Sequence, residues 1–326
     1  MLVLSRADVE ELLDLDLLVD ALADAMVDLS QGRADMPTRI AALVADRQGL
    51  LAAMPAFLPS AGALTTKLVS LFPQNTDRPT HHAIIACFDP DTGAPAALMD
   101  GSYITAARTA AGSALATKLL AKPQWAVVSV IGTGVQGHAH VRALSRLPGL
   151  EAIHVAGRSP EKVASLREEL AAQGIRTEPV ASIEDAVRSA DVVCASTHAT
   201  EPVMRRQWLR PGTHVNAVGY NMHGAGEVDA ETIRDSVVVV ESRDAALAPP
   251  PSGAIEIHRA VEAGIIKPDH ISAEIGELLT GDRPGRTDDA QLTLYKSVGV
   301  AVQDAAAAAL VLDIARRRGA GREIDL

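Results

Sequence analysis

The sequence predicts an α/β protein in which a doubly wound parallel sheet is joined to a smaller α+β domain. Length and the order of the segments support this prediction. A chain of 326 residues is long for one hydrophobic core, so two domains are expected. From Trp125 onward, short apolar segments typical of strands alternate with amphipathic helical segments. This alternation is typical of a parallel sheet that helices cover on both faces.

The N-terminal part of the chain has a different pattern. Residues 5–29 carry apolar side chains at the i, i+3, i+4 spacing of one amphipathic helix. Apolar segments at 38–44, 50–57, 63–72 and 83–88 then follow one another without helices between them. Strands in this order indicate an antiparallel or mixed sheet, and therefore a separate α+β domain.

Two Ala-rich helices are predicted on either side of the parallel-sheet region. Residues 105–120 form the first, and residues 295–318 read as one long helix. A terminal helix beyond the last strand is expected to return to the first domain. We therefore predict one domain over 1–122, joined by a C-terminal helix at 300–326, and a second over 123–299.

A complete G-x-G-x-x-G motif opens the second domain. A strand is predicted over 127–131 and a helix over 138–147, and between them lie Gly132, Gly134 and Gly137. In this context Gly132 permits a tight turn, Gly134 lets the backbone approach a pyrophosphate, and Gly137 lets helix and strand pack closely. The helix N-terminus also offers N–H groups and a positive dipole end to the anion. The motif therefore predicts a dinucleotide site in a Rossmann domain.

The end of the next strand indicates which nucleotide binds. NAD sites commonly have an acidic residue there, which binds the 2′-hydroxyl of the ribose. Here the strand at 152–156 is followed by Gly157, Arg158 and Ser159. A guanidinium and a hydroxyl suit the extra charge of a 2′-phosphate, so we expect NADP(H), with NAD(H) less favoured. The alternative is that Arg158 is a solvated loop residue.

Three cations in the first domain lie among apolar or small neighbours. They are Arg39, Lys67 within a predicted strand, and Arg108 within an Ala-rich helix. A cation in apolar surroundings needs an anionic partner. One such residue is more often part of a structural ion pair, but three beside a nucleotide domain indicate a site that binds a small carboxylate-bearing substrate.

Charge, hydropathy and cysteine content argue against other classes. The formal net charge of −11 disfavours general nucleic-acid binding. No apolar run is long and continuous enough to span a bilayer, and the N-terminus lacks the basic segment of a secretory signal. Cys87 and Cys194 lie in apolar runs, as expected in a reducing compartment, and no spacing suggests a metal site. We expect a cytoplasmic protein with no metal and no nucleic-acid or membrane partner.

Several motifs together resemble one known family. They lie at residues 67–69, 79–81, 99–101, 104–111, 132–136, 199–203, 211–219 and 295–299, with Asp304 beyond them. They resemble the ornithine cyclodeaminase and mu-crystallin family, which also includes archaeal-type alanine dehydrogenases and cyclic ketimine reductases. The resemblance covers nearly the whole chain.

The resemblance implies a homodimer whose first domain supplies both the dimer contacts and the substrate site. It implies that Arg39, Lys67 and Arg108 bind the substrate carboxylate, and that Asn221 lies beside the nicotinamide. Residues from the glycine turn and from other segments would line the NADP(H) site, namely Gly132, Gly134, Val135, Gln136, Gly137, Thr80, His81, Thr109, Arg158 and Ser159.

Asn221 is the position at which the chain departs from the cyclodeaminase pattern, which has Asp there. An amide cannot act as a general base or pair as an anion with an ammonium group. This favours a reductase that transfers a hydride from NADPH to the C=N carbon of an α-imino acid. Candidate substrates are Δ1-pyrroline-2-carboxylate, Δ1-piperideine-2-carboxylate and the imines of 2-oxo acids. Lys67 is the best candidate for a proton relay, and His81 is a weaker one.

Three other functions stay open from the sequence. An NAD(P)-dependent alanine or other amino-acid dehydrogenase would run the same hydride step after ammonia addition. Ornithine cyclodeaminase is disfavoured by Asn221. A non-catalytic, crystallin-like NADPH-binding protein would not need to keep Arg39, Lys67 and Arg108.

Overall fold

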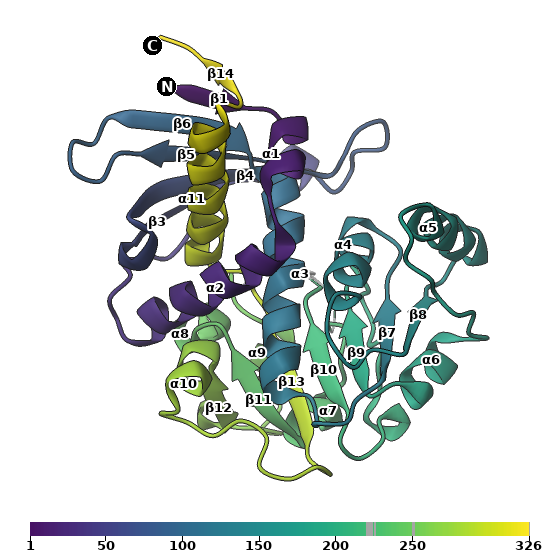
Figure 1. Ribbon diagram of the computed structural model, residues 1–326. Helices are drawn as coiled ribbons and strands as arrows, with labels where there is room; N and C mark the ends of the chain where they lie inside the picture. The colour runs from purple at the N-terminus through teal and green to yellow at the C-terminus, as the bar shows by residue number, and fades with distance from the viewer. Residues whose placement is uncertain (220–223, 225, 250–251, 326) are drawn as a thin grey trace. The chain divides into compact units, whose positions relative to one another are not determined.

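The computed structural model describes residues 1–219, 224, 226–249 and 252–325, and its chain divides into two compact units (Figure 1). Unit 1 consists of Met1–Arg108 and Gly299–Leu326, and unit 2 of Thr109–Val298. The first division falls at Arg108 rather than after residue 122, within the uninterrupted helix α3 (Gly101–Leu120).

The sheet of unit 1 is mixed, with the strand order β14-β1-β6-β5-β4-β3-β2. Strands β1 and β6 are parallel, and the other neighbouring strands are antiparallel. The bounds are Leu2–Leu4 for β1, Ile40–Val44 for β2, Gly49–Leu58 for β3, Ala63–Leu71 for β4, His81–Phe88 for β5, Pro95–Asp100 for β6 and Arg322–Glu323 for β14. The α+β prediction for this part of the chain is confirmed.

The N-terminal helical segment is broken into α1 (Arg6–Leu12) and α2 (Leu15–Ser30), so the prediction of one helix over 5–29 is wrong. The reason is Asp14, whose side chain accepts hydrogen bonds from the backbone N–H groups of Asp16 and Leu17 at 2.8 and 3.1 Å. An acceptor in this position caps the start of a helix, so α2 begins anew there.

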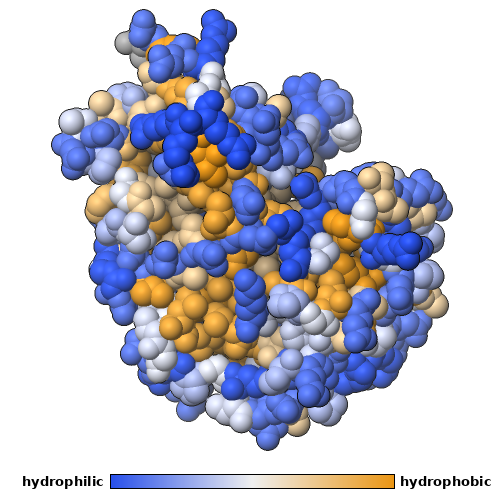
Figure 2. Space-filling view, in the orientation of Figure 1, coloured by the Kyte–Doolittle hydropathy of each residue, from blue (hydrophilic) through white to orange (hydrophobic). Residues whose placement is uncertain are grey.

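The C-terminal helix α11 (Ala301–Arg318) packs against β3, β4 and α2 within unit 1. Its small alanine side chains allow this close approach, and most of its first half is buried. Its last turn carries Arg316, Arg317 and Arg318, which are exposed, and Figure 2 shows the hydrophilic side chains gathered over this end of the helix. Cations at a helix C-terminus interact favourably with the helix dipole.

Unit 2 contains a parallel sheet with the order β12-β11-β13-β10-β9-β7-β8. The strands are β7 (Val127–Ile131), β8 (Ala152–Ala156), β9 (Val192–Ala195), β10 (His214–Ala217), β11 (Ser236–Val240), β12 (Ile271–Glu274) and β13 (Leu292–Lys296). Strand β8 lies on one side of β7, and β9, the next strand along the chain, lies on the other side of β7. This reversal is the topological switch point of a doubly wound fold, so the predicted Rossmann architecture is confirmed.

The helices of unit 2 connect these strands (Figure 1). They are α4 (Val135–Leu144), α5 (Pro160–Ala172), α6 (Ile183–Ser189), α7 (Ala230–Arg234), α8 (Arg243–Leu247), α9 (Ile255–Glu262) and α10 (Ile275–Thr280). Short 3₁₀ helices lie at Ala45–Arg47, Pro59–Ala61, Arg206–Trp208 and Pro268–His270.

Strand β13 occupies part of the segment predicted as one long C-terminal helix over 295–318. Tyr295 is buried in β13, between β11 and β10, and the helix begins only at Ala301. Gly299 has φ +72° and lies between the strand and the helix, in a left-handed conformation that favours glycine. The prediction of one helix is therefore wrong at its start.

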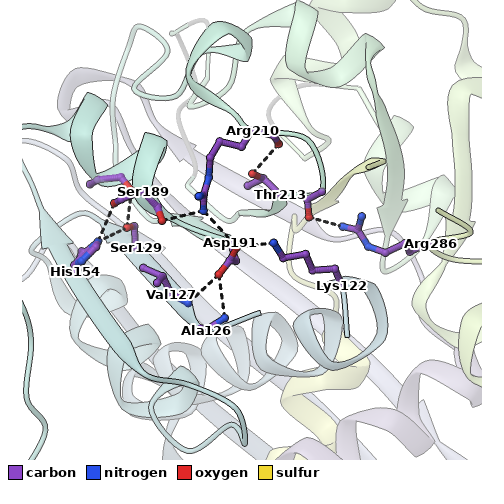
Figure 3. Close-up of polar contacts among 12 residues, drawn as sticks. Lys122, Ala126, Val127, Ser129, His154, Ser189, Asp191, Arg210, Thr213 and Arg286 are labelled. Atoms are coloured by element: carbon purple, nitrogen blue, oxygen red, sulfur yellow. Dashed lines mark hydrogen bonds and ion pairs between the residues drawn. The ribbon is translucent and has the colours of Figure 1, made fainter. Parts of the chain in front are cut away.

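The amino edge of the unit 2 sheet is held by Asp191 (Figure 3). Its carboxylate accepts hydrogen bonds from the N–H groups of Ala126 and Val127 at 3.0 and 3.1 Å, just where β7 begins. It also pairs with Lys122 Nζ at 2.8 Å and with Arg210 at 3.3 Å. Burial would raise the pKa of Asp191, but Lys122 and the two N–H donors hold it below its ordinary value. One carboxylate thus joins the starts of two neighbouring parallel strands.

Candidate active site

The turn between β7 and α4 contains the glycine motif. Gly132 has φ +129°, and a Cβ there would lie 2.6 Å from the backbone oxygen of Ser196. A Cβ on Gly137 would overlap the backbone oxygen of Gly132. Packing within unit 2 therefore requires glycine at both positions, as the motif predicts.

Gly134 is different, because a Cβ there would have no described heavy atom within 4 Å. It is the N-cap of α4, and no side chain in the described part of the chain caps this helix. Packing does not explain a glycine at this position. A ligand that approaches the backbone there would explain it, as a pyrophosphate does in a dinucleotide site.

Two neighbouring residues also suit a ligand. The Gln136 side-chain oxygen is buried and has no hydrogen-bond partner among the described residues, and Val135 keeps 68% of its surface exposed. Buried polar atoms normally have a partner, so an acceptor of this kind fits a ligand donor. The residues present in this turn fit a bound dinucleotide.

Arg158 and Ser159 follow β8, as predicted, and Arg158 is exposed. The Ser159 hydroxyl is the N-cap of α5. It accepts a hydrogen bond from Lys162 N at 3.2 Å and donates one to Glu161 Oε2 at 2.7 Å. The position of Arg158 leaves its guanidinium available to an anion in solution.

In unit 1, Lys67 and Arg108 converge on one carboxylate. Lys67 Nζ lies 2.7 Å from Asp304 Oδ2, and Arg108 Nε lies 3.1 Å from Asp304 Oδ1. Arg108 also donates to Gln303 Oε1 at 3.0 Å. Lys67, Arg108 and Asp304 retain 2%, 5% and 1% of their surface exposed, so two cations are buried against one carboxylate.

Arg39 joins the same group through Gly299. Its Nη2 donates to the Gly299 backbone oxygen at 2.7 Å. A Cβ on Gly299 would lie 2.8 Å from the guanidinium nitrogens of Arg108, so this glycine also makes room for that side chain. The three cations singled out in the sequence are therefore brought together by the segment 299–304.

The charges in this cluster shift one another's pKa values. The pKa of Lys67 is lowered to about 8, mainly by burial and also by Arg108 and Arg39, while Asp304 opposes the shift. Burial would raise the pKa of Asp304, but Lys67 and Arg108 hold it below its ordinary value. A lysine with a pKa near 8 can exchange a proton near neutral pH.

His81 is the first residue of β5, and the charges of the same cluster affect its pKa. The pKa of His81 is lowered to about 4, mainly by burial and also by Lys67 and Arg108, while Asp304 opposes the shift. The imidazole is therefore neutral at pH 7.

The other predicted site residues lie elsewhere. Thr80 precedes His81 in an exposed loop, and Thr109 is buried in the part of α3 that belongs to unit 2. Asn221 lies outside the described residues.

Sequence reasoning missed two parts of this arrangement. Asp304 appears in a resembling motif, but its role depends on Arg108, which is 196 residues away in the chain. The second part is a buried group in unit 2, formed by Glu227, Glu256 and Lys296. For Lys296, the sequence did contain a signal, namely a charged side chain next to the apolar residues of a strand.

Comparison with known proteins identifies the family. The model of the ornithine cyclodeaminase/mu-crystallin family matches residues 1–319. The chain belongs to this family. It is 37% identical over 303 residues to the ketimine reductase mu-crystallin of Mus musculus, with 91% of each chain covered.

Solved structures of similar proteins have the same fold. The Δ1-pyrroline-2-carboxylate reductase of Thermococcus litoralis, in complex with NADH and L-proline, has a TM-score of 0.93 and 36% identity over 99% of this chain and 100% of its own. An archaeal alanine dehydrogenase dimer with bound NAD has a TM-score of 0.91 and 31% identity over 100% of this chain and 99% of its own. These relatives confirm the predicted enzyme class, and this member of the family is an oxidoreductase.

Among the described residues, no group of three or more His, Cys, Asp or Glu side chains could hold a metal ion. In the same part of the chain, no helix is long and apolar enough to cross a membrane.

Proposed function

We propose that this protein is an NADPH-dependent reductase of α-imino acids. The observation that carries the proposal is the burial of Lys67 and Arg108 against the single carboxylate of Asp304. Buried charges are stable when they are paired, so this group lacks one negative charge. A substrate carboxylate would supply it, and the guanidinium of Arg108 suits a carboxylate because both are planar.

The substrates proposed are cyclic ketimines such as Δ1-pyrroline-2-carboxylate and Δ1-piperideine-2-carboxylate, or imines of 2-oxo acids. Each has a carboxylate on the carbon that is reduced. The names of the ketimine reductase and pyrroline-2-carboxylate reductase relatives support this class. Arg39, Lys67 and Arg108 would bind the carboxylate.

The proposed cofactor binds in unit 2, where the glycine turn and Gln136 fit a dinucleotide. When bound, the reduced nicotinamide supplies the hydride. Arg158 in place of a carboxylate after β8 supports NADPH, whereas the two solved relatives hold NADH and NAD. Both nucleotides therefore belong in the assay. Asn221, Thr80, His81, Thr109 and Ser159 complete the set of proposed site residues.

Lys67 is the proposed proton donor. Its pKa of about 8 leaves it mostly protonated at pH 7 and still able to release the proton to an imine nitrogen. His81 is neutral at that pH, so we assign it a hydrogen-bonding role rather than acid catalysis.

The proposed assembly is a homodimer formed through unit 1. Large apolar side chains are exposed on its strands, with 71% of Ile40, 50% of Leu51 and 43% of Ile84 accessible, and the strand register places these three on one face of the sheet. Contiguous exposed apolar surface of this kind commonly marks an interface. Sedimentation velocity should show a dimer for the wild-type chain and a monomer for Ile40→Glu combined with Leu51→Glu. A wild-type monomer would contradict the dimer.

The activity is tested by following NADPH oxidation with each cyclic imine, beside pyruvate with ammonia or methylamine, and by repeating each with NADH. Turnover of a cyclic imine with NADPH preferred supports the whole proposal. Preference for NADH removes the NADPH assignment alone. Activity with pyruvate and ammonia only would assign the chain to the amino-acid dehydrogenases. No turnover, with nucleotide still bound, would refute the reductase.

A further inference from the structure

A second group of charges is buried in unit 2 and has no part in the proposed chemistry. Glu227, Glu256 and Lys296 retain 1%, 3% and 2% of their surface exposed. Lys296 Nζ lies 3.1 Å from Glu256 Oε1, and the backbone N–H of Glu227 donates to the same oxygen at 3.2 Å. Burying three charged side chains is costly, so their contacts indicate what they hold in place.

Glu227 joins the ends of two neighbouring strands. Its carboxylate accepts hydrogen bonds from the backbone N–H of Thr197, just after β9, and from that of Gly219, just after β10, the latter at 2.5 Å. Strands β9 and β10 are adjacent and parallel, so both contacts lie at the carboxyl edge of the sheet.

Both backbone polar groups of Gly219, the N–H and the carbonyl oxygen, are hydrogen-bonded within this cluster. Lys296 Nζ donates to the Gly219 backbone oxygen at 3.1 Å, while Glu227 accepts from its N–H. A Cβ on Gly219 would overlap the Glu227 carboxyl group, and a Cβ on Gly226 would overlap the side chain of Glu256. The two glycines therefore admit the two carboxyl groups, which is independent support for a built arrangement.

The topology of the sheet indicates which part of a dinucleotide these strand ends would meet. The glycine turn follows β7, and β8, with Arg158 after it, lies on one side of β7. If the pyrophosphate lies on the turn and the adenosine ribose lies toward β8, the other half extends over β9 and β10. The end of β9 is beside the turn, because Ser196 N donates to Ile131 O at 2.9 Å.

We propose that Glu227, supported by Lys296 and Glu256, is a positioning residue that fixes the ends of β9 and β10 for the nicotinamide half of the dinucleotide. The inference rests on the proposed dinucleotide binding. Burial raises the pKa of Glu227, while Lys296 and the two N–H donors act in the opposite direction. The N–H contacts are of the kind that a carboxylate accepts, as at a helix N-cap or an oxyanion site.

The test compares two ligands by isothermal titration calorimetry. One is NADPH or NADH, whichever the wild-type chain binds more tightly, and the other is the corresponding ADP-ribose, which lacks the nicotinamide. Glu227→Gln presents an NH₂ group to one of the two N–H donors and so loses one contact. We expect it to weaken dinucleotide binding about tenfold, the loss of one hydrogen bond to a charged group, and to leave ADP-ribose binding unchanged.

Asp191→Asn is the matched control. Asp191 also accepts two backbone N–H bonds and pairs with a lysine, but at the amino edge of the same sheet (Figure 3). This variant should bind both ligands as the wild type does. A nicotinamide-specific loss in Asp191→Asn would overturn the inference, because the effect would then come from general loosening of the sheet.

The outcomes separate the inference from the proposed function. If the wild-type chain binds both ligands and Glu227→Gln changes neither, or both alike, the positioning role fails and dinucleotide binding stands. If the wild-type chain binds neither ligand, both proposals fail. Should Glu227→Gln not fold, Glu227→Asp takes its place: it keeps the charge but is one methylene too short to reach both N–H groups, and the same selective loss is expected.

Discussion

Each unit contains a buried cluster of charged side chains, and the two clusters have opposite charge balance. In unit 1, Lys67 and Arg108 outnumber the carboxylate of Asp304, and in unit 2, Glu227 and Glu256 outnumber Lys296. The partners differ as well. Asp304 is bound by side chains, whereas Glu227 is bound by the main chain at two strand ends.

This difference indicates two uses of buried charge. Side chains can turn toward an incoming anion, so an excess of cations on side chains suits ligand binding. A carboxylate that takes backbone N–H bonds fixes the main chain and leaves its own charge satisfied. The contrast supports the two proposed roles, in which the cluster of unit 1 binds a substrate carboxylate and the cluster of unit 2 fixes the ends of β9 and β10.

The largest expected effect is at Lys67. Lys67→Met removes the proposed proton donor and one carboxylate contact, while Arg108 still pairs with Asp304. We expect kcat to fall by about 10²–10⁴-fold, the usual contribution of general acid catalysis. The dissociation constant of the nucleotide should not change. Steady-state kinetics and calorimetry measure the two.

The exposed Lys118 on α3 provides a control for Lys67→Met, because Lys118→Met removes the same charge from the surface. Its kinetics should match the wild type. Equal kinetics for Lys67→Met and the wild type would remove Lys67 from the chemistry.

The glycine turn offers a pair of variants with opposite consequences. Gly134→Ala has open space for its methyl group, so the midpoint of thermal unfolding should stay unchanged while nucleotide affinity falls roughly tenfold to a hundredfold. Gly137→Ala meets the Gly132 oxygen and should lower the free energy of unfolding by about 1–3 kcal/mol. Full nucleotide affinity in Gly134→Ala would contradict the proposed site.

A smaller effect is expected in the pH profile. Because the pKa of Lys67 is about 8, kcat/KM should fall as the pH rises through that value and the ammonium is lost. A bound substrate carboxylate raises this pKa, so the fall in kcat should lie at higher pH. Asp304→Asn removes a partner that raises it, so the fall in kcat/KM should move to lower pH. A profile that Asp304→Asn leaves in place would exclude Lys67 as the titrating group.

The stability of unit 1 should respond to pH with the opposite sign. The pKa of Lys67 is lowered from 10.5 to about 8 on folding, so the unfolded chain binds more protons between these values. The free energy of unfolding therefore gains a contribution as the pH rises through this range. Lys67→Met should lack this contribution in urea titrations at pH 8 and 10, whereas Lys118→Met should keep it.

The smallest expected effect concerns Arg158, which is exposed. Arg158→Ala should weaken NADPH binding about tenfold, as expected for loss of one charge-assisted hydrogen bond, and leave NADH binding unchanged. Equal effects on the two nucleotides would assign Arg158 to the loop rather than to the 2′-phosphate.

The fold was predictable wherever local pattern decides it. The strand, glycine turn and helix around Gly132 have a periodicity and spacing that few other structures share, and the strands of unit 1 follow without helices. The errors arose where a local pattern is ambiguous. Asp14 reads as one polar residue on an amphipathic helix but caps a new one, and Tyr295 reads as helical beside an Ala-rich segment but lies in a central strand.

The candidate site was predictable in its cations and not in their partners. Arg39, Lys67 and Arg108 stand out because charged side chains are rare among apolar neighbours. Asp304 lies in a helix that resembles any other Ala-rich helix, and only the folded chain brings it to Lys67 and Arg108. The same holds for Glu227, whose partners are backbone N–H groups that the sequence does not distinguish.

The division of unit 1 between the two ends of the chain has a consequence for its synthesis. The carboxylate that pairs with Lys67 lies at residue 304, and β14 pairs with β1, which is synthesised before the other strands of the sheet. During translation, Lys67 and Arg108 therefore leave the ribosome long before Asp304, with which they pair in the folded chain. The strands of unit 2 are complete before that point. Domains usually fold in order from the N-terminus during synthesis. Here we expect the reverse: unit 2, in the middle of the chain, should fold before unit 1, which contains the N-terminal residues.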